Sequence, residues 1–295
     1  MGDIMHTFLR AVGFSKYKSR KQLEKVYRAI LNSPNRKIVT SISVDTSLIQ
    51  FEKDFGDSIG LCLIGEYDIN SALSIEHCFP YIKGDSYMQF DRIALSKKSD
   101  TESYLGACDD YSLDEPVVFY LQNIADYAKS KWFNYSNRSF NEIKLSALSV
   151  SGTIILGINK DVKQPSFGSQ LKKIHDSFAG GPSSEGLEDL ENLTLDHLEA
   201  AAHIASRIRK EDLLSIIDTS LIPTGFEFDH YLVVGTILKV TEATNHFTGE
   251  LVYNLLIEAT DFIINVAINS LDLQGEPKEG RRFRGEIWLQ GHVKI

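Results

Sequence analysis

Short apolar runs with a two-residue period recur through this chain and restrict the folds open to it. Between residues 37 and 161 they are rich in β-branched and aromatic residues, as in "KIVTSISVD", "SLIQFEKDF", "SIGLCLIGEY", "YMQFDRIAL", "IKLSALSV" and "TIILGI". Turn residues such as Gly56-Asp57 separate them. Because the runs lie too close together for many crossover helices, they predict a mostly antiparallel sheet.

Helical patterns are fewer than strand patterns. Apolar residues at helical spacing predict helices over about residues 5–12, 20–33 and 117–131. The second of these begins with Ser19 and Gln22, which are spaced as a capping box. The first 161 residues therefore indicate a strand-rich α+β fold.

The last seventy residues indicate an all-β segment. "YLVVGTILKV" is apolar on both sides, as in a central strand, while residues 251–257 and 262–268 alternate. A final strand would direct Phe283, Ile287, Leu289 and Val293 inward. Four such strands predict a small OB-like barrel or an open meander.

The overall pattern predicts a two-domain protein. Residues 1–161 form the α+β domain, and residues 162–194 lose periodicity and gather Gly, Pro and Ser, which is typical of a mobile linker. Residues 195–225 contain two linking helices, followed by the break at Pro223-Thr224-Gly225. Residues 226–295 form the OB-like β domain.

Composition and charge exclude several classes of protein. The net charge of −9 argues against an extended nucleic-acid surface, although residues 1–40 hold nine Lys or Arg against two acidic residues. No apolar run approaches the roughly 20 residues of a membrane span. The three cysteines, Cys62, Cys78 and Cys108, are widely spaced and are expected to be buried, reduced thiols. We expect a cytoplasmic protein that contacts no membrane.

The chain contains no recognisable catalytic, cofactor or metal motif. His197 and His203 are six residues apart and face different sides of a helix, so they cannot share an ion. The segment "AGGPSSEG" lacks the lysine and the preceding strand of a phosphate loop. We therefore expect no metal and no cofactor, and the catalytic residues, if any, are unknown.

The closing segment "RRFRGEIWLQGHVKI" holds the best candidate binding residues. Strand parity directs its polar side chains and its tryptophan away from the core, and the candidates are Arg282, Arg284, Trp288, Gln290 and His292. On an OB-like barrel, an aromatic ring flanked by arginines can stack single-stranded bases. Alternatively, Trp288 covers the joint between the two domains. We favour the joint, because residues 226–295 hold six basic against ten acidic residues.

These observations favour a binding or regulatory module without catalytic activity, with a protein partner or a small ligand at the domain joint. Two alternatives stay open. One is an enzyme whose composite site lies in the α+β domain or at the joint. The other is single-stranded nucleic-acid binding through the C-terminal β domain.

The two ends of the chain carry a family resemblance. The segments "MHTFLRAVGFSKYKSRKQLEK" and "GEPKEGRRFRGEIWLQG" resemble a Clostridia-type family of bacterial proteins that forms a full-length domain of unknown function. The resemblance implies a cytoplasmic bacterial protein. It supplies no activity, cofactor or catalytic residue.

Overall fold

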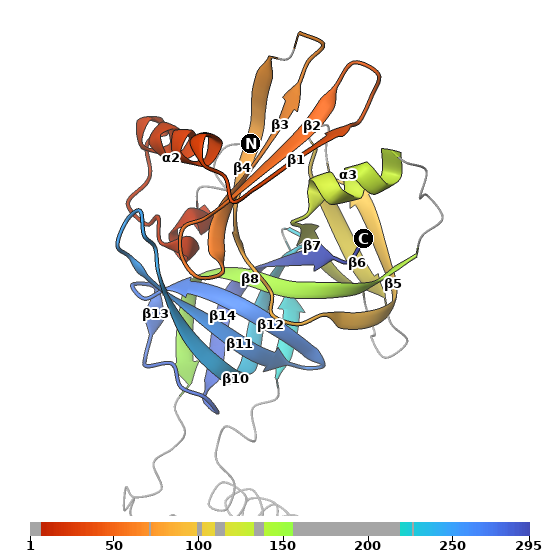
Figure 1. Ribbon diagram of the computed structural model, residues 1–295. Helices are drawn as coiled ribbons and strands as arrows, with labels where there is room; N and C mark the ends of the chain where they lie inside the picture. The colour runs from red at the N-terminus through yellow and green to blue at the C-terminus, as the bar shows by residue number, and fades with distance from the viewer. Residues whose placement is uncertain are drawn as a thin grey trace, which may run out of the picture. The chain divides into compact units, whose positions relative to one another are not determined.

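Strands predominate in the computed structural model, which describes residues 7–70, 72–98, 102–109, 116–132, 139–155, 219–225 and 227–295 (Figure 1). The helices within these residues are η1 (Leu9–Val12), α2 (Arg20–Asn32) and α3 (Ile124–Trp132). The first strands are β1 (Arg36–Ser41), β2 (Ser47–Asp54), β3 (Ile59–Tyr67), β4 (Leu73–Ile82), β5 (Met88–Lys97), β6 (Tyr104–Asp109) and β7 (Val117–Leu121). They are followed by β8 (Phe140–Ile155), β9 (Ser220–Pro223), β10 (His230–Thr244), β11 (Leu251–Ala259), β12 (Phe262–Asn269), β13 (Leu273–Gln274) and β14 (Arg282–Val293).

Strands β1 to β4 form an antiparallel sheet in sequence order. Helix α2 packs against β2 and β3, and it buries Leu23, Val26 and Ile30. The predicted capping box is confirmed, because the Gln22 N–H donates to Ser19 Oγ and the Ser19 N–H donates to Gln22 Oε1 at 3.0 Å. Helix α3 packs against β1 and β2. Strand β3 is buried along most of its length, so both faces of this sheet are covered.

The remaining strands form a second, larger sheet that closes on itself twice. In one ring of five strands, β8 pairs with β12, β12 with β11, β11 with β10, β10 with β14, and β14 with β8. In the other ring, β8 pairs with β5, β5 with β6, β6 with β7, and β7 with β14. The long strands β8 and β14 belong to both rings, and Figure 1 shows β8 crossing between them.

Phe119 fills the interior of the ring that contains β7, and two glycines make room for it. A Cβ atom on Gly106 would lie 2.0 Å from Phe119 Cζ, and one on Gly291 would lie 2.5 Å from Phe119 Cδ2. Both distances are far below contact distance, so only glycine lets these backbones approach the ring. Phe119 is fully buried as a result.

The predicted split into an α+β domain and a separate C-terminal β domain is not confirmed. The described residues up to Ile155 and from Thr219 onward form one compact unit, because β14 pairs with β8 over most of its length. The strand pattern of residues 226–295 was predicted correctly, but a strand's own sequence does not specify its partner. The predicted linker and most of the predicted helical connection lie outside the described residues, and residues 220–223 form strand β9.

One predicted helix begins too early. The helical spacing over residues 117–131 is realised only from Ile124, whereas Val117–Leu121 is strand β7. Pairing with β6 and β14 gives this β-branched segment more burial than a helical extension would. Within the described part of the chain, no helix is long and apolar enough to cross a membrane.

Candidate functional site

The five residues predicted for the closing strand do not form one site. Arg284 is exposed, Arg282 is half-buried, and both lie where β14 pairs with β10. Trp288 and Gln290 are buried, and His292 is half-buried at the far end of the strand. The predicted parity holds for Phe283 to Ile287. Beyond Ile287 both faces of β14 are covered, so the polar face is no longer a surface.

Trp288 is buried inside the unit and is not available for stacking. Its side chain is 6% exposed, and its ring centroid lies 5.3 Å from that of Phe8 and 5.1 Å from that of Tyr120. Its Nε1–H donates a hydrogen bond to Asp229 Oδ2 at 2.9 Å. Trp288 thus packs inside one compact unit against residues that are distant in the sequence, and the joint between two separate domains that we favoured is not confirmed.

Asp229 completes this cluster as a buried anion with several partners. Besides Trp288, it meets His230 Nδ1 at 3.1 Å and the Lys98 ammonium at 3.8 Å. Burial alone would raise the pKa of Asp229, but the hydrogen bonds from His230 and Trp288 and the charge of Lys98 hold it below the usual value. The polar atoms of the Trp288–Asp229 pair are thus engaged within the protein.

A network of glutamine side chains joins the smaller sheet to the larger one. Gln122 Nε2 lies within hydrogen-bonding distance of Ile82 O, Ser146 Oγ and Gln290 Oε1, at 3.0, 3.0 and 2.9 Å. Gln290 Nε2 in turn donates to Pro80 O at 2.9 Å. Because these buried amides are paired with both sheets, they fix the distance between them.

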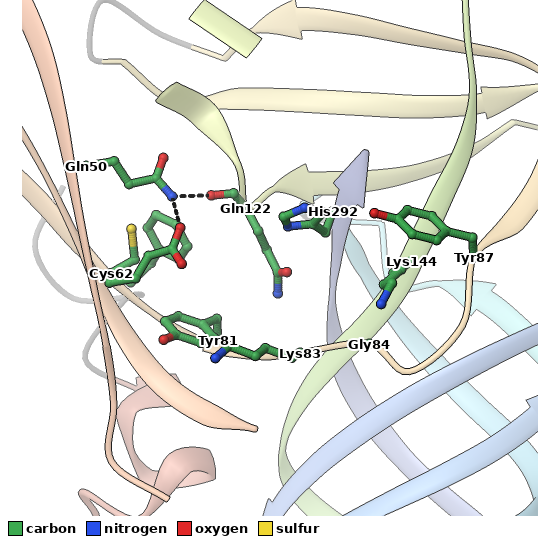
Figure 2. Close-up of a pocket in the computed structure, with 11 residues that line it drawn as sticks. Gln50, Cys62, Tyr81, Lys83, Gly84, Tyr87, Gln122, Lys144 and His292 are labelled. Carbon is green, nitrogen blue, oxygen red and sulfur yellow. Dashed lines mark hydrogen bonds between the residues drawn. The ribbon is translucent and has the colours of Figure 1, made fainter. Parts of the chain in front are cut away.

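The inter-sheet cavity lies beside this network and has a volume of about 180 Å³ (Figure 2). Strands β2, β3 and β4 contribute one wall, and Gln122, β8 and β14 contribute the other. Its lining consists of Gln50, Glu52, Cys62, Phe79, Tyr81, Lys83, Gly84, Tyr87, Gln122, Lys144 and His292. In Figure 2, Gln50 and Cys62 lie on one side of the view and Lys144 and Tyr87 on the other.

Glu52 is a largely buried carboxyl group at the Gln50 end of the cavity. Its Oε1 accepts a hydrogen bond from Gln50 Nε2 at 2.8 Å and lies 3.3 Å from Arg36 Nη1. Arg36 is committed mainly to Asp126, whose two oxygens lie 2.9 and 3.0 Å from its Nη2. Burial raises the pKa of Glu52, and the Arg36 charge offsets this only in part.

Lys144 is the cation at the opposite end of the cavity. Its Nζ lies 4.9 Å from the centroid of the Tyr87 ring, and it pairs with no carboxylate among the described residues. Lys83, by contrast, is paired with Asp54 at 2.6 Å. Lys144 therefore presents a positive charge to the cavity without a protein anion to neutralise it.

Further polar groups of the lining are unused by the described residues. Gln122 Oε1 and Glu52 Oε2 accept no hydrogen bond from them, and the Tyr87 hydroxyl and His292 ring nitrogens form none with them. Figure 2 shows the Tyr87 hydroxyl pointing toward His292. Burial lowers the pKa of His292, so the imidazole is neutral near pH 7 and offers one donor and one acceptor. Among the described residues the one fully buried side-chain atom without a partner is His77 Nδ1, which does not line the cavity, so the groups named here are reached by water and are available to a ligand in its place.

The nucleophile candidates of the cavity are held in their unreactive, protonated forms. Burial raises the pKa of the Cys62 thiol well above its usual value. Burial also raises the pKa of Tyr81, whose hydroxyl donates to Asp54 at 2.7 Å. A thiol or phenol in this state is a poor nucleophile at neutral pH.

A second, more open hollow adjoins the inter-sheet cavity, with a volume of about 670 Å³. The two share Tyr87 and His292 in their linings. Its other lining residues are Arg36, Asn123, Asp126, Lys129, Ser130, Val293, Lys294 and Ile295.

Among the predicted candidates only His292 lines the cavity, so sequence reasoning missed most of the site. A weak signal was present in Gln50 and Gln122, which interrupt or end the apolar runs "SLIQFEKD" and "VVFYLQN". Such residues are expensive to bury unless they are paired. No local pattern marks Lys144 or Glu52, which look like ordinary exposed positions of alternating strands.

The three cysteines are free and buried, as predicted. Within the described ranges, no three His, Cys, Asp or Glu side chains are grouped so that they could hold a metal ion. His197 and His203 lie outside these ranges.

Comparison with known proteins identifies a family for this chain but assigns no activity to it. Neither the curated proteins nor the solved structures contain a significant match. One family model, described as a domain of unknown function from an E. rectale gene description (DUF3881), matches residues 9–291. Because the match covers nearly the whole sequence, as the resemblance of the two ends predicts, this chain belongs to the DUF3881 family of domains of unknown function.

Proposed function

We propose that this protein is a cytoplasmic binding module without catalytic activity, and that it holds a small polar ligand in the inter-sheet cavity. The observation that carries the proposal is the convergence there of hydrogen-bonding groups that no described residue uses: Lys144 and Tyr87 at one end, Glu52 at the other, and Gln122 between them. A ligand would bind these groups in place of water, in a hollow lined by residues of both sheets.

The state of the other lining groups favours binding over catalysis. An enzyme of the composite type needs an activated nucleophile or a general base with a pKa near the working pH. Cys62 and Tyr81 are protonated at neutral pH, and the pKa of His292 is displaced away from neutrality by burial. The cavity thus offers recognition groups without an evident reactive one.

The nucleic-acid alternative has less support. A stacking platform requires an exposed aromatic ring, and Trp288 is covered by Phe8 and Tyr120. Of the two arginines, only Arg284 is exposed, and the exposed Glu286 follows it on the same face of β14. This alternation of charge suits solvation better than binding to a phosphate backbone.

The proposal includes a fold assignment for the ring of β8, β10, β11, β12 and β14 as an OB-like barrel. Five strands in a closed ring suit this assignment, with β8 as the fifth strand that residues 226–295 lack. The parallel pairing of β12 with β8 argues against an up-and-down meander, in which all neighbours are antiparallel.

Binding is tested by titrating the purified protein with small polar metabolites and following its thermal unfolding, with calorimetry on any that stabilise it. We expect stabilisation that is lost in Lys144→Met, which keeps the length of the side chain and removes its charge. Lys239→Met is the matched control, because Lys239 is exposed on β10 away from the cavity. If Lys144→Met binds every ligand as the parent does, the cavity is not the binding site.

A further inference from the structure

The unused groups of the inter-sheet cavity differ in kind between its two ends. The end at Tyr87 presents the Lys144 ammonium, the Tyr87 hydroxyl and the His292 imidazole, all of which can donate hydrogen bonds. The end at Gln50 presents Glu52 Oε2, and Gln122 Oε1 lies between the two ends; both oxygens accept hydrogen bonds. In Figure 2, Gln122 and His292 lie between Gln50 on one side and Lys144 on the other.

We infer that the ligand is a small zwitterion, with a carboxylate or phosphate group at Lys144, Tyr87 and His292 and an ammonium group at Glu52 and Gln122. This inference rests on the proposed function and gives it a ligand class. An amino acid, or an amino alcohol phosphate, has both groups within one short molecule.

The charges of the cavity exclude simpler ligands. An anion alone would neutralise Lys144 but would leave Glu52 Oε2, at the other end of the cavity, without a ligand group. A cation alone would neutralise Glu52 but would leave Lys144 without a partner. Only a ligand that carries both charges can form charge-assisted hydrogen bonds at both ends.

Arg36 does not take the place of the ligand's ammonium group. It binds Asp126 through Nη2 with two short contacts, and it reaches only Glu52 Oε1, at the longer distance of 3.3 Å. Glu52 Oε2 keeps its capacity to accept. Asp126 and Arg36 largely neutralise each other, so the local excess of negative charge at this end remains with Glu52.

The volume of the cavity restricts the size of the zwitterion. About 180 Å³ is below the roughly 300–1,000 Å³ of pockets that bind drug-sized ligands. The ligand therefore has few non-hydrogen atoms, as in the smaller amino acids. A longer side chain would have to leave the cavity past Tyr87 and His292 into the adjoining hollow.

The inference is tested with matched series of probes on the full chain by isothermal titration calorimetry. The zwitterions are L-serine, β-alanine, γ-aminobutyrate and phosphoethanolamine; their partners are propionate, butyrate and inorganic phosphate, which lack the ammonium group, and ethylamine and propylamine, which lack the anion. We expect at least one zwitterion to bind about tenfold or more tightly than either of its partners, because each lost end removes a charge-assisted hydrogen bond.

Two variants assign the ends of the zwitterion. Glu52→Gln and Lys144→Met should each weaken its binding by about tenfold or more. Glu258→Gln and Lys239→Met are the matched controls, since both residues are exposed on β11 and β10, and they should leave binding unchanged. If a variant does not fold, the test is the affinity of the parent protein for the zwitterion compared with its affinity for the matched anion and amine.

The remaining outcomes separate this inference from the proposed function. An anion or an amine can bind as tightly as the zwitterion, with no effect of the variant at the end that it does not contact. That outcome overturns the zwitterion as the ligand class, while the cavity remains a binding site. Absence of binding by every zwitterion, anion and amine overturns both.

Discussion

Two positions four residues apart on β14 show how one strand serves two purposes. Trp288 lies in a cluster whose polar groups are all engaged: its Nε1–H binds Asp229, and Asp229 meets His230 and Lys98. His292 lies at a cavity in which several polar groups, among them Lys144 and the Tyr87 hydroxyl, form no hydrogen bond with the described residues. The first arrangement stabilises the fold, while the second leaves free energy to be gained from a ligand.

The contrast teaches that burial of polar residues is not by itself a sign of function. Gln122 and Gln290 are as buried as Trp288, and their amide groups hold the two sheets together. What distinguishes the cavity is unused hydrogen-bonding capacity at Lys144, Tyr87 and Glu52. Stability measurements on the Trp288 cluster and on the residues of the cavity should therefore differ in size and in sign.

Replacing Trp288 by Ala should give the largest loss of stability. The change removes a ring packed against Phe8 and Tyr120 and leaves a cavity, at a cost of about 3–5 kcal/mol in free energy of unfolding. Urea denaturation of parent and variant measures it. Trp288→Phe keeps most of the volume of the side chain and should lose much less stability. A Trp288→Ala variant as stable as the parent would mean that the ring is not part of the core.

Asp229→Asn should give the next largest effect, a loss of about 1–3 kcal/mol, because it removes the charge from hydrogen bonds to Trp288 and His230. The pKa of Asp229 is below its usual value of 3.8. Its charge therefore stabilises the fold above that pH, and this contribution is lost as pH falls through the folded-state pKa. The difference between parent and variant should shrink in acid; a difference that is constant with pH would assign the effect to packing.

Glu52→Gln should act in the opposite direction at neutral pH. Burial raises the pKa of Glu52 above 4.5 against the opposing charge of Arg36, so ionisation costs stability as pH rises through the folded-state pKa. The variant should then gain up to about 1 kcal/mol, the size expected for a partly exposed charge beside Arg36 and Asp126. Thermal unfolding from pH 4 to pH 8 follows it. A loss of stability at pH 7 would show that Glu52 supports the fold.

Lys144→Met should have the smallest effect on stability, within about 0.5 kcal/mol of the parent without ligand, because Lys144 forms no ion pair with the described residues. Its effect should appear only when ligand is added, as lost stabilisation. Urea denaturation with and without a bound zwitterion gives the difference in free energy of unfolding between parent and variant in each condition. A large loss without ligand would instead place Lys144 among the structural residues, beside Trp288.

The strands and their faces could be predicted from sequence because they depend on local alternation. Phe283, Ile287, Leu289 and Val293 are buried as their parity requires, and the capping box of α2 forms between Ser19 and Gln22. The helix predicted over residues 117–131 was wrong in its first part, because sheet pairing outweighed helical spacing at β7. The family resemblance of the two ends is likewise borne out.

The candidate site could be predicted only at His292. Its other groups come from β2, β8 and the segments after β4 and β7, so residues as far apart as Glu52 and Lys144 meet only through the pairing of the sheets. The polar face assigned to Trp288 and Gln290 exists in the sequence pattern, but a second layer of structure covers it.

By itself the sequence determined the strand-rich α+β class, the inward faces of the strands, the free and buried cysteines and the family. Only the tertiary structure decided that β8 pairs with β14 and closes both rings, that Trp288 packs inside the unit, and that Glu52 and Lys144 face one cavity. The reason is physical: alternation is set by the backbone of each strand, whereas the choice of partner depends on burial and hydrogen bonding between segments that lie more than a hundred residues apart.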